Sequence, residues 1–329
     1  MNFFQILSDI EKVDPEVYDR LDSRRRVFKH MTGVGQKLSA AALPLFVNSI
    51  FNKAYAQTPA ISDVNVVLNF ALKLEYLESF FYQARTGITS QLSSVNAAAL
   101  ATIATDEANH VTFLRGVLGT AAITPPTAAT FDFTAKGNFS TVLTNAATYL
   151  AVAQSLEDTG VRAYKGAAPL TPVMANKIVL TAALNIHSVE ARHASHIRSM
   201  RRGGNIATNT TPSNSVAVSP YSAQPKSWIS GTDGGGAGGT ATAPVYAAGN
   251  NNGAATYGAN NQSGTASGVL FVAEDNTTQG GVPLSGTTIT SITFPTGSTA
   301  FSEAFDEGLD VGTVAGIANL FSVSGTYFN

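Results

Sequence analysis

The chain has 329 residues, a formal net charge of −2 at pH 7 and only 13% charged residues. This length allows one large domain or two small ones around a sizeable core, and the nearly balanced net charge gives no bulk basic field for nucleic acid. The absence of cysteine excludes disulfides, iron–sulfur clusters and a cysteine nucleophile.

Residues 1–57 have the features of an export signal. Three consecutive arginines at 24–26 resemble a twin-arginine motif. The apolar run at 38–51 is too short for a conventional membrane span, and residues 54–56 form a small-x-small cleavage site before Gln57. The segment predicts an exported protein of the periplasm or cell envelope, without a transmembrane helix. The alternative is a retained helical arm in a cytoplasmic protein, which the acidic stretch before the arginines favours.

Residues 61–202 have the pattern of four amphipathic helices, with apolar side chains at intervals of three and four. Asp63 is expected to cap the first helix, and the second is expected to begin near Ser94. The stretch 125–138 predicts a long connection between two helical pairs, and residues 169–172 precede the fourth helix. We therefore expect a mainly α protein built on a four-helix bundle.

The same four-residue pattern occurs twice on these helices. The first copy comprises Glu75, Tyr82, Glu107 and His110, and the second comprises Glu157, Tyr164, Glu190 and His193. In each copy a tyrosine follows the lone glutamate at i+7, and a Glu-x-x-His begins 32 or 33 residues after that glutamate. Residues at i and i+3 share one face of a helix, so each Glu-x-x-His points a carboxylate and an imidazole in the same direction.

This donor set predicts two metal ions per chain. A glutamate can bridge two cations with its two oxygens, and the mixture of oxygen and nitrogen without thiolate suits iron or manganese better than structural zinc. The carboxylates lie on apolar faces, where they need cations. The alternative is that each Glu-x-x-His lies on a solvated face. Glu78 is expected at the wet edge of its helix and His196 at the surface, while His187 is a candidate for a supporting contact beside Glu190.

Two segments, LNFALKLEYLESFFYQ at 68–83 and ATDEANHVTFLRGVLG at 104–119, resemble the ferritin-like di-metal carboxylate superfamily. The similarity is greatest to its bacterial branch related to plant desiccation-related proteins. The resemblance implies one ion on Glu75, Glu107 and His110, another on Glu157, Glu190 and His193, bridges by Glu107 and Glu190, and outer hydrogen-bonding or redox-buffering groups at Tyr82, Tyr164 and Asp106. Asp106 precedes Glu107 whereas Val189 precedes Glu190, so the two halves are expected to orient their histidines differently.

Residues 203–300 are rich in Gly, Ser, Thr, Asn and Ala. Short β-like runs at 218–230, 243–249, 268–275 and 287–294 predict an ordered β-rich extension, and disorder is the alternative. Its low charge suits contact with another copy of the chain or with an envelope partner. Residues 301–329 are expected to end in a helix from about Val311 to Phe321, capped by Asp310 and packed on the bundle.

Two functions remain open at this point. The first is an oxidoreductase, ferroxidase-like or manganese-catalase-like, that uses a di-iron or di-manganese centre on oxygen, peroxide or ferrous iron in stress protection. The second is a structural or desiccation-protective envelope protein in which the metal site is only structural or vestigial.

Overall fold

The computed structural model describes residues 63–201, 228–229, 239–250, 271–279, 282–284 and 301–329, together with the strand residues at 256–257, 262–263, 288–289 and 292–293. The predicted export signal or arm at 1–57 lies outside the described residues, as does most of the extension at 203–300.

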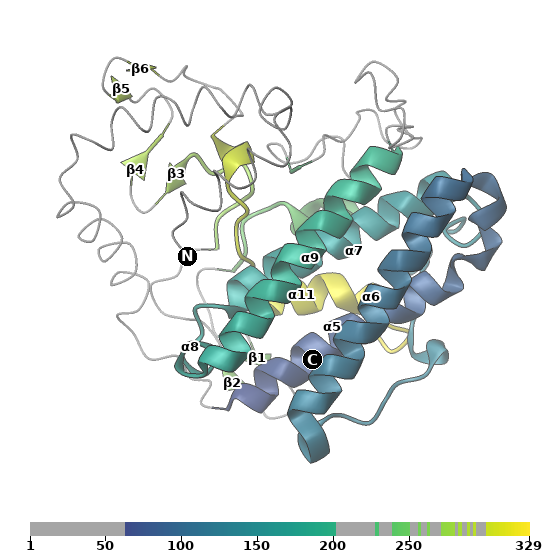
Figure 1. The fold of residues 1–329 in the computed structure, drawn as a ribbon, viewed down its shortest axis with the longest axis horizontal. Coiled ribbons are helices and arrows are strands. Elements are labelled where there is room, and N and C mark those ends of the chain that lie inside the picture. The colour runs from purple at the N-terminus through teal and green to yellow at the C-terminus, as the bar shows by residue number, and fades with distance from the viewer. Residues whose placement is uncertain are drawn as a thin grey trace, which may run out of the picture. The chain divides into compact units, whose positions relative to one another are not determined.

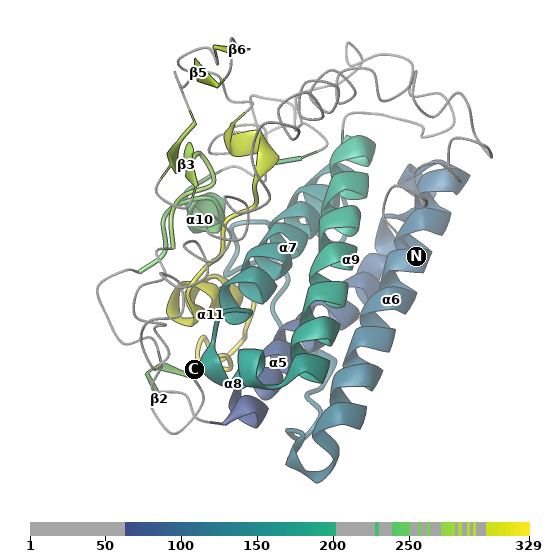
Figure 2. The same cartoon turned by 60° about the vertical axis from the view of Figure 1, so that its left-hand side comes forward.

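Four long helices form the bundle: α5 (Val64–Gln83), α6 (Ser94–Leu118), α7 (Ala146–Ala167) and α9 (Lys177–Arg201). Helix α5 packs along α6 and α7 packs along α9, which gives two helical hairpins (Figures 1 and 2). Side-chain caps begin three of these helices, at Asp63, Ser93 and Asn145. Each capping side chain accepts a hydrogen bond from a main-chain N–H of the first turn, where no carbonyl of the helix itself is available as a partner. The prediction of a mainly α four-helix bundle is confirmed.

Short 3-10 helices and one short α-helix complete the connections. The turn between α5 and α6 contains η1 (Ala84–Gly87) and η2 (Thr89–Gln91), and α8 (Thr171–Ala175) lies between α7 and α9. The long connection from α6 to α7 contains η3 (Gly119–Ala121) and η4 (Ala128–Thr130). It is held to the C-terminal segment by two main-chain hydrogen bonds, from Asp132 N to Phe321 O at 2.8 Å and from Val323 N to Thr130 O at 2.9 Å.

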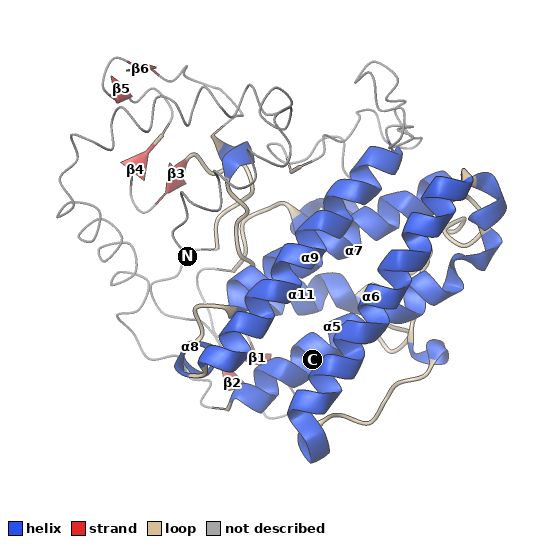
Figure 3. Cartoon of the chain, viewed as in Figure 1, coloured by secondary structure: helices blue, strands red, loops and turns tan. Residues whose placement is uncertain are grey.

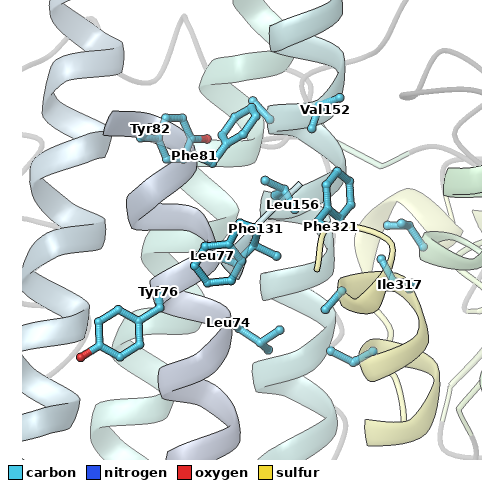
Figure 4. Close-up of a cluster of buried hydrophobic side chains, with 14 of the residues drawn as sticks. Leu74, Tyr76, Leu77, Phe81, Tyr82, Phe131, Val152, Leu156, Ile317 and Phe321 are labelled. Carbon is cyan, nitrogen blue, oxygen red and sulfur yellow. The ribbon is translucent and has the colours of Figure 1, made fainter. Parts of the chain in front are cut away.

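The C-terminal helix α11 (Val311–Asn319) packs against α7. It follows η8 (Ser302–Ala304) and is capped by Asp310, whose side chain accepts a hydrogen bond from Thr313 N. Figure 4 shows Ile317 and Phe321 on the side of the bundle where Leu156 lies. These three side chains are at most 3% exposed, so α11 extends the bundle core.

The described part of the extension contains only short elements (Figure 3). They are α10 (Gly239–Thr242), η7 (Ala243–Val245) and six two-residue strands: β1 (Thr256–Tyr257), β2 (Gln262–Ser263), β3 (Thr278–Gln279), β4 (Val282–Pro283), β5 (Thr288–Ile289) and β6 (Ile292–Thr293). The strands pair antiparallel as β1 with β2, β3 with β4, and β5 with β6. The predicted run at 287–294 thus contains a strand pair.

Two other predicted β-runs are wrong where they can be compared. The run at 243–249 begins as a 3-10 helix, and the described part of 268–275 contains no strand. The two runs lie around the buried side chain of Arg162, which donates to the main-chain oxygens of Val245, Ala247 and Val272. Two main-chain hydrogen bonds join the runs, from Gly249 N to Phe271 O and from Glu274 N to Tyr246 O. Among the described helices, none is long and apolar enough to cross a membrane.

Candidate metal centre

Four carboxylates, one from each long helix, meet in the centre of the bundle. They belong to Glu75, Glu107, Glu157 and Glu190, and each residue is 0% exposed. Glu-x-x-His spacing on α6 and α9 adds the imidazoles of His110 and His193 on the same faces. We call these six residues the carboxylate cluster.

The two histidines lie among the carboxylates rather than beside them. Nδ1 of His110 is 3.1 Å from Glu75 Oε2 and 3.3 Å from both Glu107 Oε2 and Glu190 Oε1. Nδ1 of His193 is 2.9 Å from Glu107 Oε1 and 3.3 Å from Glu157 Oε2. Both rings therefore present the same nitrogen to the cluster.

The donor atoms fall into two overlapping groups. One contains Glu75, Glu107, His110 and Glu190, and the other contains Glu107, Glu157, Glu190 and His193; within each group one donor atom per residue lies within 4.8 Å of the others. Glu107 and Glu190 belong to both groups. The structure thus brings together all six residues that the sequence predicted as ligands, and places between the two halves the two glutamates that were expected to bridge.

The hydrogen bonding of these atoms is compatible with a cation. Glu107 Oε1, Glu157 Oε2, both carboxylate oxygens of Glu190 and His193 Nδ1 are buried and make no hydrogen bond among the described residues. A buried carboxylate without a partner is costly, and such groups are rare in folded proteins unless an ion or water satisfies them. The donor set of carboxylate oxygen and imidazole nitrogen fits iron or manganese.

Two tyrosines hold the outer oxygens of the cluster. The Tyr82 hydroxyl on α5 donates to Glu157 Oε1 on α7, and the Tyr164 hydroxyl on α7 donates to Glu75 Oε1 on α5. The contacts are reciprocal between the two helices, so the duplicated sequence corresponds to a duplicated arrangement in space. Burial, followed by the charge of the glutamate that each contacts, raises the pKa of both tyrosines well above the ordinary value, so they remain donors.

The pKa values of the cluster show how strongly its negative charge attracts protons. Burial by itself lowers the pKa of His193, but Glu157 and Glu107 outweigh it and raise the value to about 12. The pKa of His110 is also raised far above its ordinary range by Glu107, Glu190 and Glu75, against the effect of burial. Burial and the neighbouring Glu107 raise the pKa of Glu190. Without a metal ion, protons neutralise part of the cluster.

Asp106 makes an outer contact, as the sequence suggested. Its Oδ2 lies 3.2 Å from Nε2 of His193 on α9. The Asp106 side chain is 39% exposed, whereas that of His193 is 7% exposed. The carboxylate therefore holds the histidine of the other half of the site rather than the histidine of its own helix.

The expectation for Glu78 is wrong. This residue is 4% exposed, and burial together with the charges of Glu190 and Glu107 raises its pKa well above the ordinary value. It lines a cavity of about 10 Å³ between α5, α7 and α11, so α11 covers the edge that would otherwise be wet. The one indication of burial in the sequence is that Glu78 lies at i+3 from Glu75 and therefore near the same face of the helix.

The remaining histidines stay outside the cluster. His187 places Nδ1 3.0 Å from the main-chain oxygen of Val161, so it supports α7 rather than Glu190. His196 is half-buried rather than at the surface, and burial followed by the nearby His193 lowers its pKa.

Helix packing leaves two apolar cavities beside Tyr164. They measure about 40 Å³ and about 30 Å³. Both are lined by Leu68, Tyr164, Val179 and Ala183. The lining of both cavities is almost entirely apolar, so the tyrosine that holds Glu75 borders an apolar surface on this side.

Sequence reasoning missed a second buried charged group, which joins α7 to the C-terminal part of the chain. Arg162 is 0% exposed, and its Nε lies 2.7 Å from Glu274 Oε1. Its guanidinium also donates to the main-chain oxygens of Val245, Ala247, Val272, Glu307 and Gly308. Asp158 accepts hydrogen bonds from Arg198 and from the Tyr246 hydroxyl. We call Asp158, Arg162, Arg198, Tyr246 and Glu274 the arginine cluster.

This contact connects the extension to the bundle. Tyr246 and Glu274 of the extension are buried, Glu274 pairs with Arg162 of α7, and Tyr246 contacts the residue next to Glu157. Within the described residues, the extension supports the bundle without contributing a donor atom to the carboxylate cluster.

Comparison with known protein families gives one match. The family is described as a ferritin-like domain, and it matches residues 62–202, which include all four long helices and the whole carboxylate cluster. No curated protein and no solved structure matches the chain.

Proposed function

Because residues 62–202 match the family model of a ferritin-like domain, we propose that this chain binds two iron or manganese ions and uses them in redox reactions with oxygen or peroxide. The observation that carries the proposal is the carboxylate cluster, with four fully buried glutamates from four helices and two histidines among them. Ferritin-like di-metal proteins use this combination of ligands.

The residues divide naturally between two ions. Glu75, Glu107 and His110 would hold one ion, Glu157, Glu190 and His193 would hold the other, and Glu107 and Glu190 would bridge. The two overlapping groups of donor atoms support this division. Iron or manganese in such an environment supplies one-electron chemistry between its +2 and +3 states.

The chain's own residues prepare the site for that chemistry. Tyr82 and Tyr164 each hold a proton at the outer oxygen of a glutamate and so fix the orientation of that carboxylate. Two cavities with apolar lining lie beside Tyr164. They suit a small apolar molecule such as oxygen better than peroxide or a hydrated ferrous ion, so oxygen is the favoured substrate.

One experiment tests metal binding. Elemental analysis of native protein should find about two iron or manganese ions per chain. Glu107→Ala should lower this content because a shared ligand is lost, whereas Asp275→Ala, at an exposed residue of the extension, should not. Native and metal-titrated protein that both remain empty would contradict the proposal.

The alternative is a metal centre that only stabilises the bundle of an envelope or desiccation-protective protein. Its support is the complete burial of the four glutamates, which a structural ion also requires. Consumption of oxygen and of peroxide by metal-loaded protein separates the two functions. A protein that holds both ions and consumes neither substrate would favour the structural role.

Export is a separate part of the proposal and rests on the arginines at 24–26, the apolar run at 38–51 and the cleavage site at 54–56. Intact mass of protein from the native envelope fraction should correspond to a chain that starts at Gln57. A chain in that fraction that still starts at Met1 would favour the structural arm.

A further inference from the structure

We infer that the two halves of the carboxylate cluster bind metal with different affinities, and that Asp106 is the positioning residue that sets the difference. The half with Glu157 and His193 fills first and retains its ion, while the half with Glu75 and His110 exchanges its ion more readily. This inference rests on the proposed metal binding and adds an order to it.

The first observation is that the outer ring nitrogen of His193, Nε2, has a carboxylate partner. Nδ1 points into the cluster, 2.9 Å from Glu107 Oε1, while Nε2 lies 3.2 Å from Asp106 Oδ2 on the facing helix. A carboxylate on Nε2 keeps the proton on that nitrogen, so the lone pair on Nδ1 is available to a metal ion.

The second observation is that His110 has no such support. All its contacts with the surrounding carboxylates are made by Nδ1, to Glu75, Glu107 and Glu190. Among the described residues, none is found to bond Nε2 of His110. The tautomer and the orientation of the His110 ring are therefore fixed only when an ion binds.

The duplicated architecture identifies the cause. On α6 the order is Asp106, Glu107, His110, and on α9 it is Val189, Glu190, His193. If the two halves were exchanged, Val189 would take the place of Asp106 and stand opposite His110, where its side chain has no acceptor. The tyrosine contacts do not create this difference, because Tyr82–Glu157 and Tyr164–Glu75 are equivalent.

The expected difference in affinity can be taken from what hydrogen-bond partners of metal-binding histidines contribute in other proteins. Loss of such a partner lowers metal affinity about 10- to 100-fold. Because the Asp106 side chain is 39% exposed, solvent weakens its influence, and we expect a ratio near the lower end, about 10-fold. The two halves should then fill in separate steps.

Titration of metal-free, full-length protein with Co²⁺ tests the inference, with calorimetry for affinity and the visible absorption of bound cobalt for coordination. The expected result is two steps whose dissociation constants differ about 10-fold. His110→Ala should remove the weaker step and leave the tighter one. Two identical steps, or loss of the tighter step in His110→Ala, would overturn the inference.

Two variants should each reduce the difference between the two dissociation constants, one by weakening the tighter step and the other by strengthening the weaker step. Asp106→Val should weaken the tighter step and bring the two together, while Val189→Asp, at a half-buried position on α9, should strengthen the weaker step. Asp275→Val removes an exposed carboxylate outside the bundle and should change neither. Equal weakening of both steps by Asp106→Val would show that Asp106 acts on the whole site. A protein that binds no Co²⁺ in either step would overturn the proposed metal binding itself.

Discussion

Helix α7 contributes to two buried charged clusters that are neutralised in different ways. In the arginine cluster, Arg162 faces Glu274 and Arg198 faces Asp158, so each acid has a guanidinium from the same chain. In the carboxylate cluster, the ion pairs of the four glutamates within the described residues involve only His110 and His193. Buried charge that a chain neutralises with its own side chains becomes part of the scaffold, and buried charge left over requires a cation from outside.

The largest expected effect comes from removing the internal counter-charge. Arg162→Met would leave Glu274 and several main-chain oxygens without their donor, and breaking a buried pair in this way costs about 3–5 kcal/mol. We expect about 3 kcal/mol at neutral pH, because burial already raises the pKa of Glu274 to about 8, so the stranded carboxyl takes up a proton. Urea unfolding measures the change.

A matched variant and a double variant sharpen this result. Arg192→Met, on the exposed face of α9, should change the free energy of unfolding by less than about 0.5 kcal/mol. Glu274→Leu added to Arg162→Met should recover part of the loss. If Arg162→Met alone were neutral, the pairing in the arginine cluster would not matter for stability.

The next effect comes from removing the external counter-charge. Chelation of the metal-loaded protein should lower the melting temperature, because an ion that binds only the folded state at 100 times its dissociation constant stabilises that state by about 2.7 kcal/mol. Calorimetry with and without chelator measures the shift. Equal melting temperatures of the metal-free and loaded forms would mean that protons or water already neutralise the carboxylate cluster.

A smaller effect should follow when the glutamates themselves are neutralised. Glu75→Gln combined with Glu157→Gln removes two negative charges and keeps the side-chain size, so the metal-free form should gain about 1–2 kcal/mol. The same pair should weaken metal binding. Thermal unfolding of the chelated proteins provides the comparison, and a double variant less stable than the metal-free parent would show that like-charge repulsion is not what limits the empty site.

The last effect is a pH dependence of the metal-free form, which accumulates over several pH units. The pKa values of Glu78 and Glu190 are raised in the folded state, so these groups favour folding most below their unfolded value of about 4.5. That contribution falls as pH rises, by about 1.4 kcal/mol per pH unit for each proton retained only by the folded state. His193, with a pKa of about 12 in the folded state, acts in the same direction above its ordinary value of 6.5.

The expected result is a melting temperature of the chelated protein that decreases from pH 5 to pH 8. The loaded protein should lack this decrease, since the ions replace the protons. A chelated protein whose stability increases over this range would show that Glu78 and Glu190 are ionised at no cost.

The two clusters also differ in how far the sequence reveals them. The carboxylate cluster follows from helix geometry, because i to i+3 spacing on apolar faces is local and its duplication is visible in the sequence. Helix caps at Asp63 and Asp310 were predictable for the same reason. The arginine cluster depends on hydrogen-bond acceptors that lie 83 to 146 residues after Arg162. No spacing pattern in the sequence indicates these partners. Glu78 was misplaced because its cover, α11, is still farther away in the sequence.

The close contact between α7 and the residues before α11 has a consequence for synthesis. A Cβ on Gly166 would lie 1.9 Å from Leu309 O, and Arg162 takes acceptors as late in the chain as Glu307 and Gly308. At about 5–20 residues per second, a ribosome needs roughly 7–30 seconds to pass from Arg162 to these acceptors. During that interval the nascent α7 keeps its guanidinium in water and lacks its final cover, so metal ions can reach the glutamates before the last segment closes over them.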